Sequence, residues 1–184
     1  MNTKLIILKN SLSLLISLVL FAFPTANAIP EAVSFCKETL EIDFCAKYIG
    51  YQRIEAARDF SDLYLIAVSE TKIEVNDAIT QINRVRQKFN GLLGKNRISV
   101  CEKKYKIAAT SFHKSLEVGK KKSKSITDFA EMSQRTQAGF EAVHECEDEW
   151  SKHGPRQQSP LTFYFNNIQK LCQITRVIIN KFYA

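Results

Sequence analysis

Five cysteines carry the most reactive side chains of this 184-residue chain: Cys36, Cys45, Cys101, Cys146 and Cys172. Cysteines form disulfides, bind metal ions or act as nucleophiles, and the redox compartment of the protein decides among these uses. Because their number is odd, one thiol stays unpaired even if two disulfides form. Counting alone leaves open which cysteines pair, so the rest of the sequence must decide their chemistry.

A catalytic or metal site would need further groups beside these thiols. The three histidines are scattered, at His113, His144 and His153. His144 stands next to an acidic cluster formed by Glu145, Glu147, Asp148 and Glu149. Successive residues on a helix point in different directions, so this cluster is better explained as a solvated helix face than as a metal site. Signatures of serine hydrolases, zinc peptidases and nucleotide-binding loops are missing. We therefore predict a protein that is not an enzyme and has no metal or other cofactor.

The first 28 residues predict an export signal. Two lysines precede an apolar stretch at residues 11–23, and Ala26-Asn27-Ala28 offers a cleavage site of small residues. The apolar stretch is too short to span a bilayer comfortably, and no other segment is a better candidate. We expect a secreted mature chain, residues 29–184, without a membrane segment, in an oxidising compartment where disulfides persist.

Four long stretches have apolar residues at every third or fourth position, the pattern of an amphipathic helix. They lie at residues 65–89, 98–116, 129–150 and 161–182. Ser159 and Pro160 are suited to begin the last of these helices. Ahead of them, residues 30–50 predict a short helical hairpin. The mature chain is long enough for one core, and the short polar connections favour an all-α, up-and-down four-helix bundle.

The helical periodicity also bears on the cysteines. Cys101 and Cys146 fall on the apolar stripes of their helices, so they would be able to face each other across the core. Cys36 and Cys45 are close enough in sequence to be local partners across the hairpin. Cys172, on the last helix, is predicted to face the core of the bundle as a free, buried thiol that fills space.

Basic side chains dominate the charge of the chain. There are 26 of them against 19 acidic ones, a formal net charge of +7. Loss of the export signal removes two lysines and leaves 24 against 19, or +5. The lysine-rich segment at residues 120–124 is most simply a hydrated loop, but weak contact with an acidic polysaccharide such as de-esterified pectin is an alternative. Nucleic acid is not an expected partner, because the segment lacks interleaved aromatic residues for base stacking.

The order and spacing of these motifs resemble the plant pectin methylesterase inhibitor and invertase inhibitor superfamily. The resemblance runs from the export signal to the last helix and is carried by Cys36-Lys37-Glu38-Thr39, Phe44-Cys45, Leu63-Tyr64-Leu65-Ile66-Ala67, Cys101-Glu102-Lys103-Lys104-Tyr105, residues 142–150, Ser159-Pro160 and residues 171–179. It implies a four-helix bundle with an N-terminal helical hairpin. It also implies two disulfides, Cys36 to Cys45 and Cys101 to Cys146, with Cys172 free.

The resemblance further implies that residues 29–184 bind and block a carbohydrate-active enzyme. We favour pectin methylesterase of the plant cell wall as the target, bound one to one by a monomeric inhibitor in the apoplast; a vacuolar location is less favoured. Acid invertase of the cell wall or vacuole is an alternative target. A binding or structural protein of the same fold without inhibitory activity is a second alternative, because a fold does not fix a function.

Six residues are the candidate contacts with the target. Similar invertase inhibitors often carry Pro-Lys-Phe before the helix of the fourth cysteine, where this chain has Thr127-Asp128-Phe129. Asp128 would repel the carboxylates of an invertase cleft, which favours the esterase. For the esterase, the resemblance implies exposed faces of the second, third and fourth long helices, and the acidic candidates there are Glu102, Glu141, Glu145 and Asp148.

Overall fold

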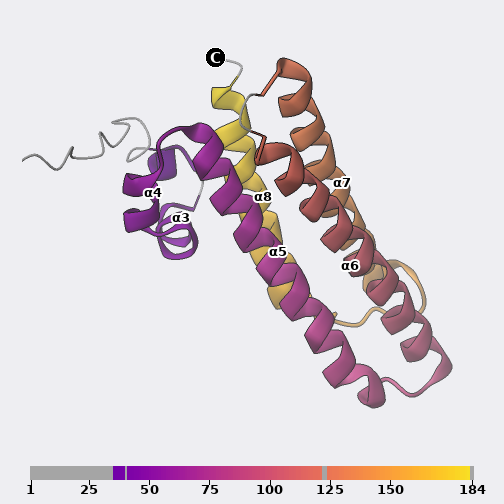
Figure 1. The fold of residues 1–184 in the computed structure, drawn as a ribbon. Helices are drawn as coiled ribbons and strands as arrows, with labels where there is room; N and C mark the ends of the chain where they lie inside the picture. Colours follow the sequence, from indigo (N-terminus) through magenta and orange to yellow (C-terminus); the bar gives the residue numbers. More distant parts are fainter. Residues whose placement is uncertain (1–34, 40, 122–123, 183–184) are drawn as a thin grey trace, which may run out of the picture.

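The computed structural model describes residues 35–39, 41–121 and 124–182, and these residues form helices and their connections (Figure 1). Along the chain the elements are η1 (Phe35–Glu38), α3 (Ile42–Ile49), α4 (Tyr51–Ala56), α5 (Phe60–Val85), η2 (Arg86–Lys88), α6 (Leu92–Gly119), α7 (Ile126–Lys152) and α8 (Thr162–Lys181). The predicted all-α class and its four long helices are confirmed. The predicted export signal lies outside the described residues. Within them, none of the helices combines the length and apolarity of a membrane span.

The four long helices pack as an elongated bundle. Figure 1 shows α5 running beside α8, and α6 running beside α7. Contacts are most extensive between α6 and α7 and least extensive between α7 and α8, while α5 packs on both α6 and α8. The seam between α7 and α8 is therefore the loosest of the four, and a groove lies along it.

Each long helix buries one apolar stripe. The stripes include Val68, Val75 and Ile82 of α5, Ile98, Tyr105 and Phe112 of α6, Met132, Val143 and Trp150 of α7, and Ile168, Leu171 and Ile178 of α8. Full burial of one such aliphatic or aromatic side chain contributes about 1.5 to 3 kcal/mol. The three- and four-residue spacing that predicts these helices is thus the spacing of the residues that fill the core.

The interface of α6 and α7 is close and cross-linked. Cys101 and Cys146 form a buried disulfide with their Cα atoms 4.6 Å apart. Trp150 packs beside it and donates its indole N–H to the Cys101 sulfur at 3.3 Å. Further along, Gly139 lies against the Phe112 ring so closely that a Cβ atom at residue 139 would sit 2.8 Å from ring carbons. The absence of a side chain at Gly139 is what lets the two helices approach.

A buried hydroxyl network ties three helices together near one end of the bundle. The Tyr64 hydroxyl of α5 bonds to the hydroxyls of Ser115 on α6 and Thr136 on α7. The Met132 carbonyl lies 3.0 Å from both the Tyr64 and the Ser115 hydroxyl oxygens and serves as a further acceptor for this network. Burial raises the pKa of Tyr64, so its hydroxyl stays protonated and able to donate.

The N-terminal elements form the implied hairpin and pack on α5 and α8. Its disulfide joins Cys36 to Cys45, with the Cα atoms 5.6 Å apart. Gly50 separates α3 from α4 with a φ of 82°, a conformation that glycine adopts without strain.

Polar contacts fix this hairpin to the bundle. The Asn167 amide of α8 donates to the Tyr48 hydroxyl at 2.7 Å and to the Glu74 carboxylate at 3.2 Å. Two further ion pairs reach α8, from Glu41 to Lys170 at 3.2 Å and from Glu38 to Lys181 at 2.8 Å.

The connection between α7 and α8 is held by a buried cation. Arg97 of α6 is 1% exposed. Its guanidinium donates to the carbonyls of His153 and Pro155 and to the Gln157 side chain. It also lies 5.4 Å from the Trp150 ring, within range of a cation–π interaction. One charged side chain therefore fixes the path of a connection that lies more than fifty residues away in sequence.

The last helix begins slightly later than predicted. Pro160 was expected at its first position, but α8 starts at Thr162. Ser159 instead forms a turn, in which its hydroxyl accepts from the Leu161 N–H at 3.1 Å.

Candidate functional site

The acidic candidate on α6, Glu102, is engaged within the molecule. Its two carboxylate oxygens bind Lys106 at 2.7 Å and Arg86 at 2.6 Å. These two cations hold the pKa of Glu102 below its usual value. Because Arg86 follows directly after α5, Glu102 lies on the α5 side of α6. The structure therefore does not bring Glu102 together with the acidic candidates of α7.

The three acidic candidates of α7 share one face of that helix. Glu141, Glu145 and Asp148 are spaced by four and three residues, which places their side chains in one row. Glu141 and Glu145 are exposed, and Asp148 is half-buried. Figure 1 shows that α7, which carries this row, runs beside α6. Of the candidate contact residues, these three are the ones that the structure brings together on one surface.

Each member of this row has a partner. Glu145 pairs with Lys104 of α6. Asp148 pairs with Lys152, which holds its pKa below the usual value, and its carboxylate lies 3.4 Å from His144. Glu141 accepts a hydrogen bond from Gln137 at 3.0 Å. Surface ion pairs of this kind contribute about 1 kcal/mol or less, so a partner protein can exchange them at little cost.

Asp128 serves the start of α7 instead of facing outward. Ser125 is the N-cap residue, and the two form a capping box in which the Asp128 carboxylate accepts from the Ser125 N–H at 2.8 Å. Lys121 binds the same carboxylate at 2.6 Å. Asp128 is thus not the cap itself, because it stands at the third helical position and completes the box.

Phe129 is likewise used within the bundle. Its ring stacks on Phe182 at the end of α8, with the ring centroids 4.1 Å apart. Phe60 approaches the same Phe182 ring edge-on at 6.4 Å. Neither Asp128 nor Phe129 is therefore presented as a free side chain at the start of α7.

We expect Asp128→Asn to lower the melting temperature at neutral pH. Lys121 and Ser125 hold the pKa of Asp128 well below its usual value. Its carboxylate therefore stabilises the fold at any pH above the ordinary value of about 4, and this stabilisation fades as the pH falls further. Thermal unfolding followed from pH 7 to acid should show wild type and variant converging. Asp77→Asn, at an exposed position of α5, is the control; a Tm difference at pH 7 no larger than that of the control would contradict the capping role.

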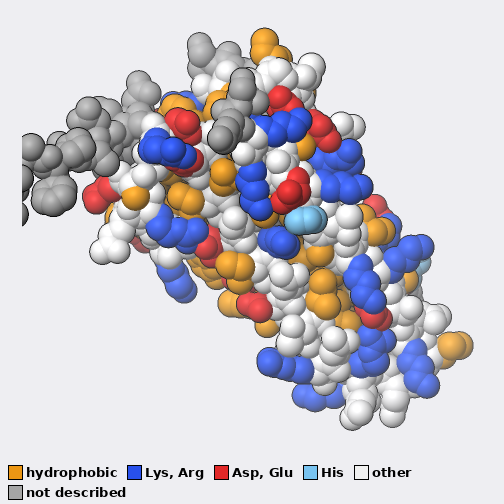
Figure 2. All heavy atoms as spheres, in the orientation of Figure 1, with side chains coloured by type: hydrophobic (Ala, Val, Ile, Leu, Met, Phe, Trp, Pro, Cys, Tyr) orange, Lys and Arg blue, Asp and Glu red, His pale blue; other side chains and the backbone are white. Residues whose placement is uncertain are grey.

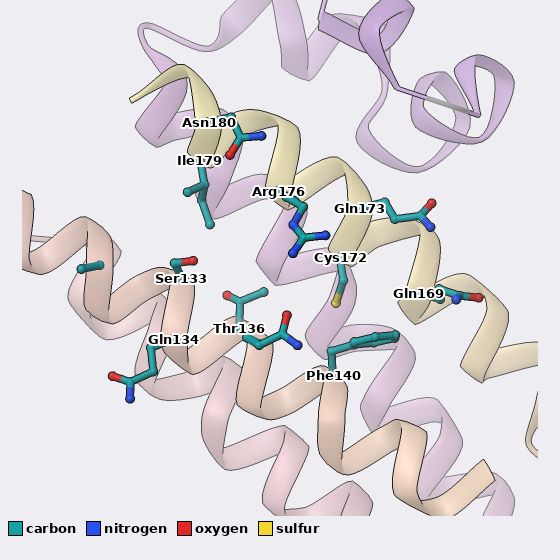
Figure 3. A pocket seen from close by; sticks show the side chains of 12 residues that line it. Ser133, Gln134, Thr136, Phe140, Gln169, Cys172, Gln173, Arg176, Ile179 and Asn180 are labelled. Atoms are coloured by element: carbon teal, nitrogen blue, oxygen red, sulfur yellow. The ribbon is translucent and has the colours of Figure 1, made fainter. Parts of the chain in front are cut away.

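A groove of about 600 Å³ runs along the loose seam between α7 and α8. Figure 3 shows side chains from both helices directed into it. Its lining is mostly uncharged and polar and includes Gln134, Gln137, Gln169, Gln173, Asn180, Ser133 and Thr136, with Phe140 and Ile179 as apolar members. Amide side chains both donate and accept hydrogen bonds, so this lining suits a polar partner surface.

Arg176 is the charged residue of this lining. Within the described residues, no carboxylate oxygen lies within 4 Å of its guanidinium. The groove was not predicted, although polar residues at helical spacing on α7 and α8 are a signal for it. Gln134 and Gln137 are three residues apart, and Gln169 and Gln173 are four apart.

Cys172 is the free cysteine among the described residues, and it packs against the core. It is less buried than predicted, because one side of it also lines this groove. Figure 3 shows it on α8 across from Thr136 and Phe140. Burial raises the pKa of its thiol to about 12, so very little of the reactive thiolate is present at neutral pH.

The acidic and histidine residues of α7 have no metal-site geometry. Among the residues that the structure describes, no group of three or more His, Cys, Asp or Glu side chains is arranged to hold a metal ion. His144 instead packs near Phe140 and Phe165, with ring centroids 6.2 and 5.8 Å away.

Comparison with known proteins gives consistent results. The chain matches the family described as plant invertase/pectin methylesterase inhibitor over residues 32–178. It is 46% identical over 175 residues to an Arabidopsis thaliana protein named pectinesterase inhibitor 5, a match that covers 94% of this chain and 95% of the relative.

Two solved structures of pectin methylesterase inhibitors from Arabidopsis share the fold. A mutant form matches with a TM-score of 0.65 at 19% identity, over 82% of this chain and 95% of the other. A second crystal structure matches with a TM-score of 0.58 at 18% identity, over 83% and 95%. At these identities the likeness concerns the bundle and its hairpin.

Proposed function

The chain belongs to the plant invertase/pectin methylesterase inhibitor family, and from this membership we propose that it binds a pectin methylesterase and inhibits it. The observation that carries the proposal is the 46% identity to a pectinesterase inhibitor over 94% of the chain. The proteins of this family are inhibitors, and the chain is not an enzyme.

We place the enzyme contact on the exposed faces of α6, α7 and α8. The row formed by Glu141, Glu145 and Asp148 supplies negative charge, and the groove beside it supplies hydrogen-bonding amides. Basic groups of the enzyme would replace Lys104 and Lys152 as partners of the row. Such charge pairing guides association and sets register more than it adds affinity.

Invertase is the less favoured target because of the first turn of α7. The position that is lysine in similar invertase inhibitors is here Asp128, which lies in a capping box, and the Phe129 ring packs on Phe182 and is not free to enter an acidic cleft. Both disulfides suit an oxidising location such as the cell wall. A monomeric, secreted inhibitor that forms a one-to-one complex there is the simplest form of the proposal.

The test is residual activity of purified pectin methylesterase and acid invertase after titration with residues 29–184. We expect stoichiometric loss of esterase activity between about pH 5 and 7, with invertase unaffected. Charge reversal of the row by Glu141→Lys and Glu145→Lys should weaken inhibition about tenfold or more. The matched control, Glu55→Lys with Asp77→Lys at exposed positions of α4 and α5, should leave it unchanged. Full activity of both enzymes at micromolar inhibitor would leave only the non-inhibitory alternative, whereas loss of invertase activity alone would favour the invertase alternative.

A further inference from the structure

A second hollow, separate from the groove between α7 and α8, lies where α6 meets α7. It has a volume of about 460 Å³ and is lined by Lys103, Lys106, Ile107, Thr110, Ser111 and Lys114 of α6 and Arg135 of α7. We call it the basic groove. Four of its seven lining residues carry a positive charge, and none carries a negative one.

Part of this charge is uncompensated. Lys106 pairs with Glu102 at 2.7 Å, and Arg135 pairs with Glu131 at 3.3 Å. Lys103 and Lys114 are exposed, and within the described residues no carboxylate oxygen lies within 4 Å of either ammonium group. The basic groove therefore holds two cations that are available to an external anion.

The two available cations are arranged for a chain and not for a single small ion. Lys103, Ile107, Thr110 and Lys114 are spaced by four, three and four residues, so they follow one face of α6. At about 1.5 Å per residue, Lys103 and Lys114 are separated by about 16 Å along the helix axis. One monovalent or divalent anion cannot contact both, whereas a polymer with repeated negative charges can.

The groups between the two lysines suit a sugar. Ile107 is 42% exposed, although it is a large apolar residue. Together with the aliphatic parts of the lysine side chains, it offers an apolar surface for the face of a pyranose ring. Thr110 and Ser111 add hydroxyl groups that exchange hydrogen bonds with sugar hydroxyls.

The basic groove is a better polyanion site than the lysine-rich segment at residues 120–124. Lys120 pairs with Glu117 at 3.0 Å, and Lys121 pairs with Asp128 at 2.6 Å. Of the three described lysines of that segment, these two are therefore already neutralised, and Lys124 remains as a single cation. Figure 2 shows more Lys and Arg than Asp and Glu over the face formed by α5 and α6, so the charge around α6 also favours an anionic ligand.

We propose that the basic groove binds a polyuronate chain, the carboxylated polymer of de-esterified pectin. The choice of polymer rests on the proposed function: hydrolysis of a methyl ester by the target enzyme leaves a carboxylate on the polysaccharide. The inhibitor is then retained where the esterase has already acted, and bound less where the polymer is still esterified.

The test uses residues 29–184 and a fluorescently labelled oligogalacturonate in a calcium-free buffer, with binding followed by anisotropy. The oligogalacturonate should bind, its methyl-esterified form should not, and added salt should weaken binding. Lys103→Gln with Lys114→Gln should lower the affinity about tenfold. The control, Lys37→Gln with Lys88→Gln, removes the same charge from exposed positions of η1 and η2 and should change the affinity much less.

Three results would overturn the proposal: equal binding of the esterified form, equal weakening by the control pair, or unchanged affinity of the Lys103 and Lys114 variant. Equal weakening would mean that overall charge, and not the basic groove, attracts the polymer. Inhibition of the esterase is measured separately on the same samples. A protein that binds oligogalacturonate through these lysines but does not inhibit the enzyme would retain this inference and remove the proposed function.

Discussion

Replacing Cys101 and Cys146 together by alanine should lower the free energy of unfolding by about 4 kcal/mol. The disulfide closes a loop with a sequence separation of 45 residues, and on the chain-entropy model the loss of such a cross-link has about this effect. The same change removes the sulfur that accepts the Trp150 N–H, and it leaves space in the closest interface of the bundle. These effects act in the same direction.

Trp150 offers a direct measurement of this loss. It is the single tryptophan of the chain, is 1% exposed and lies beside the disulfide. Denaturant unfolding followed by its fluorescence should therefore report on the interface of α6 and α7. The comparison variant is Cys36→Ala with Cys45→Ala, whose disulfide spans nine residues and should contribute only about 2.7 kcal/mol. An equal or larger loss in the hairpin variant would refute this ranking.

Arg97→Ala should cost about 3 kcal/mol of stability. Arg97 donates to two carbonyls and one side-chain amide, and hydrogen bonds from a charged donor contribute about 1.5 to 3 kcal/mol each. Relief of burying a charge offsets part of this loss, while the lost contact with the Trp150 ring adds to it. Arg97→Lys should retain little of this stabilisation, because one ammonium group cannot reproduce the planar set of donors of the guanidinium.

The connection between α7 and α8 provides a second readout for Arg97. Arg156 is exposed in this connection, which makes the following peptide bond a site for trypsin once the connection is released. Cleavage there should be faster in Arg97→Ala than in Lys95→Ala, which changes an exposed residue of the same helix. Equal stability and equal cleavage in the two variants would show that Arg97 does not hold the connection.

The sequence predicted the long helices well because burial and periodicity coincide. Cys101, Tyr105 and Phe112 are spaced as one helix face, and each is fully buried. The start of α7 was less predictable, because Ser125, Thr127 and Asp128 all suit a helix start in isolation. Lys121, from the preceding segment, contributes to the choice by binding the Asp128 carboxylate.

Other features depend on partners that are distant in sequence. Arg97 resembles an ordinary surface cation until its acceptors, 56 to 60 residues further on, are known. The exposure of Cys172 to the groove depends on the distance between α7 and α8. The spacing of apolar residues within one helix does not determine that distance. The pairing of Glu145 similarly requires the register between α6 and α7, which places Lys104 beside it.

The helix pairs of the bundle differ in how extensively they contact each other, so we expect them to separate with different ease. No described disulfide crosses from α8 to another element, whereas α6 and α7 are joined covalently. Separation of α8 from α7 therefore breaks few contacts, while separation of α6 from α7 requires loss of the core. Local opening follows the lowest free-energy route. We therefore expect the α7–α8 seam to open more readily than the α6–α7 interface, and this is the seam that carries Arg176 and the amide-lined groove.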